Sequence, residues 1–119
     1  GFKKSETEAY NKLSVTKKFL QENNLIENSI HTYDIDKDKL KTITYDLVIS
    51  LVSWGYHYPL ETYIDYLKDN SRDKTVFIFD IAEEYISIKN LEKFFKNIEI
   101  VNQYLKKHKQ VRVACKEII

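Results

Sequence analysis

The chain has 119 residues, of which 43% are hydrophobic and 31% are charged, and its formal net charge is +1. This composition is typical of one globular domain with a modest core, and the near-neutral charge gives no electrostatic reason to expect binding to nucleic acid or to an acidic membrane. No apolar run approaches the roughly 20 residues that span a bilayer. Because the single cysteine, Cys115, cannot form an internal disulfide, we expect a cytoplasmic protein.

The first third of the chain predicts one helix and one short strand. Ser5 and Glu8 have the spacing of a capping box, which opens a helix that we expect to end at Asn23 and Asn24. Residues 30–35 (IHTYDI) are typical of a short strand. The polar segment that follows them predicts a loop.

The middle of the chain predicts a buried strand, an aromatic loop and a second helix. Residues 47–52 (LVISLV) form the kind of apolar run that is covered on both faces in a parallel sheet. Residues 53–59 (SWGYHYP) hold the only Trp, the only Pro and the only internal Gly of the chain. Pro59 suits the first turn of a helix because it lacks an amide hydrogen, and the apolar residues after it recur with helical spacing.

The last part of the chain predicts a strand, a helix and a hairpin. Residues 75–81 (TVFIFDI) are typical of a second buried strand, and Ser87 can cap a helix that we expect to run to about Asn97. Residues 98–104 and 111–119 both look extended, and apolar and polar residues alternate in the second of them. We therefore expect an antiparallel hairpin with a basic turn.

Strands that alternate with helices indicate an α/β fold with a mostly parallel sheet, which we treat as a single domain over residues 1–119. In an open sheet of this kind, ligands bind outside the carboxyl ends of the strands. The aromatic loop at 53–59 is expected at that position. The sequence therefore predicts that the functional surface lies there.

The residues around this loop resemble a known family. The segment YDLVIS at 45–50 resembles the fourth-strand motif of class I S-adenosylmethionine-dependent methyltransferases, and SLVSWGYHYPLETYIDYL is similar to the branch that methylates sugars and other small molecules on oxygen. The resemblance implies that TVFIFDI is the fifth strand, that NIEIVNQY and QVRVACKEI form the closing antiparallel hairpin, and that IHTYDI matches the third strand. It implies a Rossmann-like sheet of which this chain supplies the C-terminal half.

Parts of the family pattern have no counterpart in the sequence. The chain has two glycines, so it has no glycine-rich turn after a first strand, and it lacks the acidic residue that binds the cofactor ribose. The absence of Met and the start at Gly1 indicate an excised or incomplete piece. In the family, two further strands lie between the third and the fourth. We therefore expect the strand at 47–52 to pair with residues 30–35 of the same chain, with a missing segment or with a second copy.

The resemblance also implies an activity and the residues that perform it. In the intact parent protein, a methyl group would pass from S-adenosylmethionine to an unidentified small-molecule acceptor. The catalytic base would be His57, because an imidazole titrates near neutral pH. The residues implied to contact the cofactor are Asp34, Ile35 and Ser50. The residues implied to line the acceptor site are Ser53, Trp54, Tyr56 and Tyr58.

Each of these interpretations has a structural alternative. The aromatic loop can instead pack on the end of the sheet and cap the core, and Asp34 can be a solvated residue at a strand end. We expect Asp46 to have a structural role and Cys115 to belong to the core. Asp80 can face a ligand at the end of its strand, but we expect it to cap a structural element or to pair with a Lys or Arg.

A metal site is not expected. Asp34, Asp36 and Asp38 alternate as in a calcium loop, but Lys39 and Tyr45 stand where an EF-hand requires Gly and Glu. The histidines and the cysteine have no metal-ligand spacing.

A rival hypothesis is a non-catalytic α/β binding or assembly module that completes its sheet by oligomerising. A coding sequence that continues upstream into a strand with a glycine-rich turn favours the enzyme. A start codon next to Phe2 favours the module. Neither hypothesis involves nucleic acid or a membrane.

Overall fold

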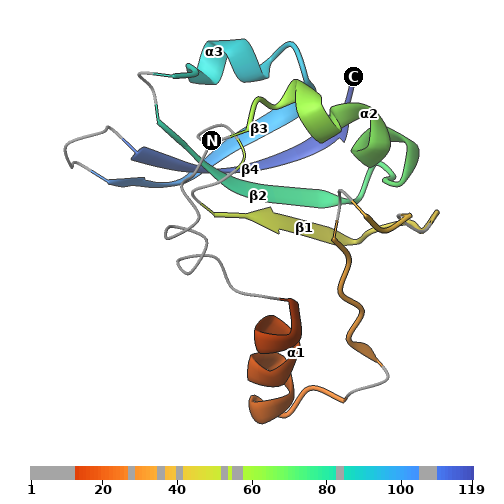
Figure 1. Ribbon diagram of the computed structural model, residues 1–119. Coiled ribbons are helices and arrows are strands. Elements are labelled where there is room, and N and C mark those ends of the chain that lie inside the picture. Colours follow the sequence, from red (N-terminus) through yellow and green to blue (C-terminus); the bar gives the residue numbers. More distant parts are fainter. Residues whose placement is uncertain are drawn as a thin grey trace. The chain divides into compact units, whose positions relative to one another are not determined.

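The computed structural model describes residues 13–26, 29–34, 37–39, 42–51, 54, 58–82, 85–104 and 110–119. The chain divides into two compact units, Gly1–Lys41 and Thr42–Ile119, and each is described by itself (Figure 1).

The first unit contains the helix α1, Leu13–Glu22. It ends at Asn24, whose φ of 69° lies in the left-handed region that Asn tolerates better than most residues. The amide of Asn24 donates to the carbonyl of Gln21 at 3.1 Å, and the amide of Leu25 donates to the carbonyl of Leu20 at 3.2 Å. This is the Schellman arrangement, so the predicted end of the helix is confirmed. The predicted start lies outside the described residues.

The predicted strand at 30–35 is wrong for its described part, because residues 30–34 have no strand partner. The chain instead turns at Asp34, whose carbonyl accepts hydrogen bonds from the amides of Lys37 and Asp38 at 3.0 and 2.6 Å. The amide of Asp34 in turn donates to the Asp38 carboxylate at 2.6 Å. Aspartates that bond nearby amides favour turns over strands, and this local chemistry outweighs the apolar pattern.

The second unit is built on a four-stranded sheet with the order β1-β2-β4-β3 (Figure 1). The strands are β1 (Leu47–Ser50), β2 (Val76–Ala82), β3 (Phe95–Tyr104) and β4 (Gln110–Ile118). The strand β1 runs parallel to β2, while β4 is antiparallel to both β2 and β3. The α/β class and the hairpin are confirmed, but the sheet formed by the described strands is mixed rather than mostly parallel.

The helices α2 (Glu61–Asp69) and α3 (Ile88–Leu91) lie on the same side of this sheet (Figure 1). The predicted helix after Pro59 is confirmed by α2, which connects the two parallel strands. The helix ends at Asn70, which is 5% exposed. The Asn70 side chain donates to the carbonyl of Tyr66 at 2.7 Å and accepts from the amide of Ile43 at 2.9 Å. This buried amide ties the end of α2 to the segment that leads into β1.

The helix α3 is shorter than predicted. The Ser87 side chain caps it as expected, by accepting the amide hydrogen of Asn90 at 3.2 Å. The predicted continuation to Asn97 is wrong, because β3 begins at Phe95. The ring of Phe95 lies 5.4 Å from that of Phe77, between centroids, and Phe95 is 1% exposed. Packing of this ring against the sheet outweighs the helical spacing of the local sequence.

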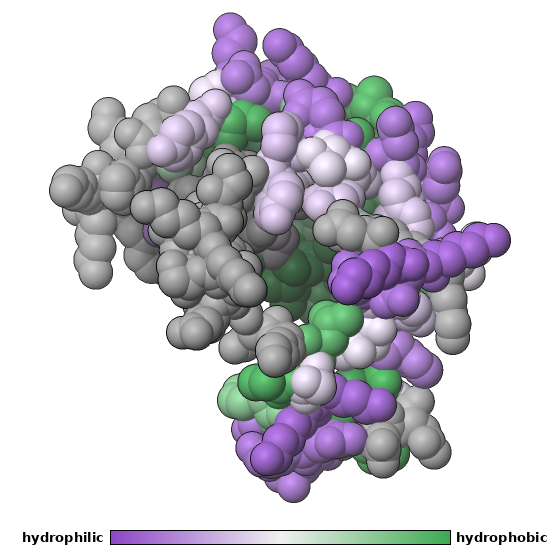
Figure 2. Space-filling model, in the orientation of Figure 1, coloured by the Kyte–Doolittle hydropathy of each residue, from purple (hydrophilic) through white to green (hydrophobic). Residues whose placement is uncertain are grey.

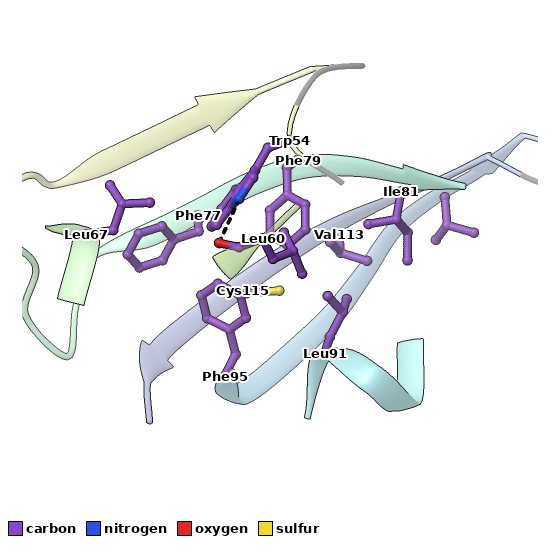
Figure 3. Close-up of a cluster of buried hydrophobic side chains, with 11 residues drawn as sticks. Trp54, Leu60, Leu67, Phe77, Phe79, Ile81, Leu91, Phe95, Val113 and Cys115 are labelled. Carbon is purple, nitrogen blue, oxygen red and sulfur yellow. Dashed lines mark hydrogen bonds between the residues drawn. The ribbon is translucent and has the colours of Figure 1, made fainter. Parts of the chain in front are cut away.

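Alternate residues of β2 and β4 point to the side of α2 and α3, which we call the helix face. This face carries the core, and each member contributed by these two strands is at most 3% exposed (Figure 3). These members are Phe77, Phe79, Ile81, Val111, Val113 and Cys115. The predicted alternation in the last strand is therefore confirmed. Hydrophilic side chains predominate over the outer surface of the two helices (Figure 2).

The other side of the sheet, which we call the opposite face, carries the alternate residues of β1 and β2. Leu47 and Ile49 of β1 pair with Val76 and Ile78 of β2 and point to this face. Leu47 is 51% exposed and Ile49 is 56% exposed. The prediction that residues 47–52 are buried on both faces is wrong for these two residues, because β1 is an outer strand and both described helices of the unit lie on the helix face.

Candidate functional site at the strand ends

The carboxyl ends of β1 and β2 meet at one edge of the sheet, because the two strands are parallel neighbours. The strand β1 ends at Ser50 and β2 ends at Ala82. The aromatic loop follows β1 at this edge, as the sequence predicts for a ligand site. The structure describes Trp54, Tyr58 and Pro59 of this loop.

Trp54 anchors the loop to the core. The residue is 4% exposed, and its indole N–H donates to the carbonyl of Leu60 at 3.1 Å (Figure 3). Its ring centroid lies 4.8 Å from that of Phe79 and 6.4 Å from that of Phe95. A buried indole whose only donor is satisfied has a fixed position, and for Trp54 this placement is the one that the structural alternative describes.

Ser50 and Trp54 are brought together. The Ser50 hydroxyl accepts the backbone amide hydrogen of Trp54 at 3.1 Å. A serine hydroxyl that accepts one bond still has its own hydrogen to donate. Ser50 therefore holds the beginning of the loop and keeps a donor at the end of β1.

Tyr58 is the described aromatic residue of the loop that reaches the surface. It is 45% exposed, and its ring centroid lies 6.2 Å from that of Tyr63 on α2. A backbone bridge joins Tyr58 to Trp54. The bridge therefore places the exposed Tyr58 beside the buried Trp54.

Several predicted site residues lie outside the described residues. These are Ile35, Ser53, Tyr56 and His57. Their predicted roles stay predictions.

Asp34 belongs to the first unit, whereas Ser50, Trp54 and Tyr58 belong to the second. The Asp34 carboxylate lies 3.9 Å from the Lys37 ammonium. In its own unit, Asp34 is thus part of the turn described above.

Asp80 forms the main ion pair of the sheet. Its carboxylate is 0% exposed and accepts two hydrogen bonds from Arg112, from Nε at 2.8 Å and from Nη2 at 3.1 Å. The two residues are direct neighbours across β2 and β4. The predicted pairing of Asp80 with a basic residue is confirmed. Both carboxylate oxygens are engaged, so Asp80 supports the sheet rather than a ligand.

Asp46 and Cys115 also contribute to the structure of the unit rather than to a ligand site. Asp46 precedes β1 and forms an exposed salt bridge with Arg72. Cys115 is 0% exposed, and burial raises the pKa of its thiol to about 12. The thiol is thus protonated at neutral pH and is not a nucleophile, so the predicted core role of Cys115 is confirmed.

Tyr85 is a further candidate for this edge, and no sequence pattern above singles it out. It is 68% exposed and follows the carboxyl end of β2, where its amide donates to the carbonyl of Ala82 at 2.8 Å. Two neighbouring parallel strands are thus each followed by an exposed tyrosine, Tyr58 and Tyr85. The sequence could have indicated Tyr85, because it follows the predicted strand at 75–81 and ligand loops in open sheets follow more than one strand end.

A pocket of about 590 Å³ lies elsewhere in the unit. Its lining includes Lys74, just before β2, together with Asn97, Glu99 and Lys116 from β3 and β4. The position is the amino end of β2, away from the edge that carries Tyr58. The lining mixes both signs of charge, so it gives no preference for one kind of ligand.

Across the described ranges, no three His, Cys, Asp or Glu side chains are grouped as a metal site. Asp36 of the alternating aspartate run lies outside those ranges. No helix in the described part of the chain has the length and apolar character needed to cross a membrane.

Comparisons of this chain with models of protein families, with curated proteins and with solved structures find no match. The resemblance to a methyltransferase therefore rests on the residues of the chain and on the order of its strands.

Proposed function

We propose that this chain is the C-terminal half of a class I S-adenosylmethionine-dependent methyltransferase that acts on a small-molecule acceptor. The order and direction of the strands support this proposal. Two parallel neighbours, β1 and β2, are joined through α2, and the antiparallel β3–β4 hairpin lies beside β2. This is the arrangement that the resemblance requires of a fourth strand, a fifth strand and a closing hairpin.

The anchored loop also supports the proposal. The loop stands at the carboxyl ends of the parallel strands, where the fold class binds ligands. In the proposed enzyme, Tyr58 lines the acceptor site and Tyr85 extends the same edge. Trp54 does not contact the acceptor in this proposal, because its ring is buried in the core and its N–H donates to the carbonyl of Leu60.

The chain by itself does not fit the cofactor. It has two glycines and no glycine-rich turn, and of the described candidates Asp34 lies near Lys37 while Ser50 accepts the Trp54 amide. S-adenosylmethionine would bring the methyl group in the intact protein. The residues of this half would align the acceptor, with His57 removing its proton.

This interpretation predicts that the isolated 119-residue chain does not bind S-adenosylmethionine. The physical reason is that main-chain approach and ribose contacts come from the half that carries the glycine-rich turn. Titration calorimetry of the chain with S-adenosylmethionine measures this directly. Micromolar binding would contradict the assignment of the chain to one half of the domain.

The catalytic role is tested in a protein that joins this segment to a glycine-rich half. There, His57→Ala is expected to lower the rate of methyl transfer by about 10²–10⁴-fold, which is the usual contribution of a general base. His108→Ala is the matched control, because this histidine lies in the sequence between β3 and β4 and has no proposed role. Melting temperatures of both variants should match the parent. An unchanged rate for His57→Ala would remove the proposed base.

We further propose that the enzyme is cytoplasmic. The buried reduced thiol of Cys115, with no second cysteine in the sequence, suits a reducing compartment.

A further inference from the structure

The two outer strands of the sheet differ in how they are protected. The outer strand β3 carries the charged residues Lys96 and Glu99, both exposed, and its register with β4 shifts between Ile100 and Asn102. Charges and bulges are the devices by which natural sheets prevent another strand from adding to an edge. The edge formed by β3 is therefore built to remain unpaired.

The outer strand β1 has none of these devices. Its sequence is Leu-Val-Ile-Ser, without a charge or a proline, and its four pairs with β2 are in regular register. Leu47 and Ile49 are more than half exposed, at 51% and 56%. An uncharged, regular and apolar edge is a template for pairing with a further strand.

The described chain contains no spare strand to cover β1. Every strand in the described ranges already belongs to the sheet, and residues 30–34 are not a strand. The other outer strand, β3, is charged and bulged, and pairing it with β1 of another copy would produce an open fibre. For the 119-residue chain by itself, the β1 strand of a second copy is the remaining partner of matching chemistry, whereas in the intact enzyme proposed above a strand of the missing half would take this place.

The β1 strand is complementary to itself. A two-fold axis perpendicular to the sheet makes two copies of β1 antiparallel and keeps each face on its own side. When the axis passes beside Val48, the middle of the apolar run, Val48 lies opposite Val48 of the second copy, and Leu47 lies opposite its Ile49. The exposed apolar row continues across the junction with no charge in it. The nearest carboxylate, Asp46, already pairs with Arg72 of its own copy.

We propose that the 119-residue chain forms a two-fold symmetric dimer by antiparallel pairing of β1 with β1 of a second copy. The two sheets become one continuous sheet, and the β3 edges remain at its ends. This inference goes beyond methyl transfer and does not depend on it. Methyl transfer and cofactor binding can fail in experiment without affecting it.

The test is the molar mass of the full 119-residue chain in solution, measured by sedimentation. We expect a dimer at about 100 μM, where a micromolar dissociation constant leaves most chains paired. Ile49→Lys places a charge on the β1 edge and should give a monomer. Ile100→Lys is the matched control, because Ile100 is 45% exposed on the β3 edge, and this variant should stay dimeric. A monomeric parent, or a dimer that survives Ile49→Lys, overturns the proposal.

A second variant tests the register of the proposed β1–β1 pairing, and its readout is a cross-link rather than the loss of the dimer. Val48→Cys should form a disulfide between two copies under mild oxidation, because directly opposed residues of antiparallel strands have the required separation of about 4.5–5.5 Å between Cα atoms. Ile100→Cys should not cross-link. The native Cys115 does not compete, because it is buried. Equal cross-linking of the two variants contradicts the β1 interface.

Discussion

The two faces of the sheet differ sharply although the same strands form both. On the helix face, Phe77 and Phe79 of β2 are 0% exposed. On the opposite face, Ile78 of the same strand is only half-buried, and Ile49 of β1 is 56% exposed. These residues of β1 and β2 are apolar on both faces, but the helices α2 and α3 cover only one face. An apolar strand can therefore be buried on both faces, but each face is buried only where another layer of the structure covers it.

The opposite face is not uniformly exposed. Asp80 and Arg112 form a two-point ion pair across the centre of the sheet on this side, with the carboxylate wholly buried. On the helix face, β2 and β4 are held together by packed apolar side chains. On the opposite face, they are held together by the hydrogen-bonded ion pair of Asp80 and Arg112. The two faces thus hold β2 to β4 by different physical means.

The largest expected effect comes from the helix face. Phe79→Ala should lower the free energy of unfolding by about 3–5 kcal/mol, because it leaves a cavity among Trp54 and the other core rings. Ile78→Ala, one residue away on the opposite face, should cost less, about 1–2 kcal/mol, because its side chain is only partly buried. Urea denaturation of both variants measures the contrast. Equal losses would mean that the two faces are equally buried in solution.

The second expected effect concerns the ion pair. Asp80→Asn keeps the shape of the side chain and removes its charge, which leaves Arg112 without its buried carboxylate. We expect a loss of about 2–3 kcal/mol in the free energy of unfolding. The matched control is Asp46→Asn, because the Asp46 side chain is 81% exposed in its pair with Arg72, and exposed pairs contribute little. Chemical denaturation at neutral pH should separate the two variants, and similar losses would contradict this account.

The third expected effect appears as a dependence on pH. Burial raises the pKa of the Cys115 thiol from 9.0 to about 12. Below pH 9 the thiol is protonated in the folded and the unfolded chain alike. Above pH 9 only the unfolded chain releases the proton, so the free energy of unfolding falls until pH 12 is reached, by about 1.4 kcal/mol per pH unit.

Cys115→Ala should abolish this part of the pH dependence. Between pH 8 and pH 10, the parent chain should lose about 1.4 kcal/mol more than the variant does. Denaturation curves at the two pH values provide the comparison, which removes the contribution of tyrosines and lysines because both chains share them. Parallel losses in parent and variant would show that the thiol is open to water.

The sequence predicts those parts of the fold in which local signals agree with the packing. Pro59 and the helical spacing after it predict α2, Ser87 predicts the start of α3, and the alternation around Val113 predicts β4. The wrong predictions concern segments whose conformation depends on contacts that the local sequence pattern does not show. The ring of Phe95 ends a predicted helix by packing on the sheet, and the aspartates around Asp34 replace a predicted strand by a turn.

The candidate site is predictable in its place but not in the orientation of its side chains. Loop position and composition pointed to the carboxyl end of β1, where Ser50, Trp54 and Tyr58 are found. No local pattern distinguishes an indole that turns inward from a phenol that turns outward, because both are aromatic residues of one polar loop. Trp54 turns inward because Leu60 offers a carbonyl to its N–H and Phe79 offers a ring to its face.

The order of the strands has a consequence for synthesis on the ribosome. The strand β4 is the last of the described strands to be made, but it lies in the interior of the sheet, between β2 and β3. Until it emerges, β3 has no partner and β2 has only β1. A nascent chain that stalls before Gln110 therefore lacks the middle of its sheet rather than an edge, and it exposes strand edges that favour aggregation. Folding of this unit has to wait for its final strand.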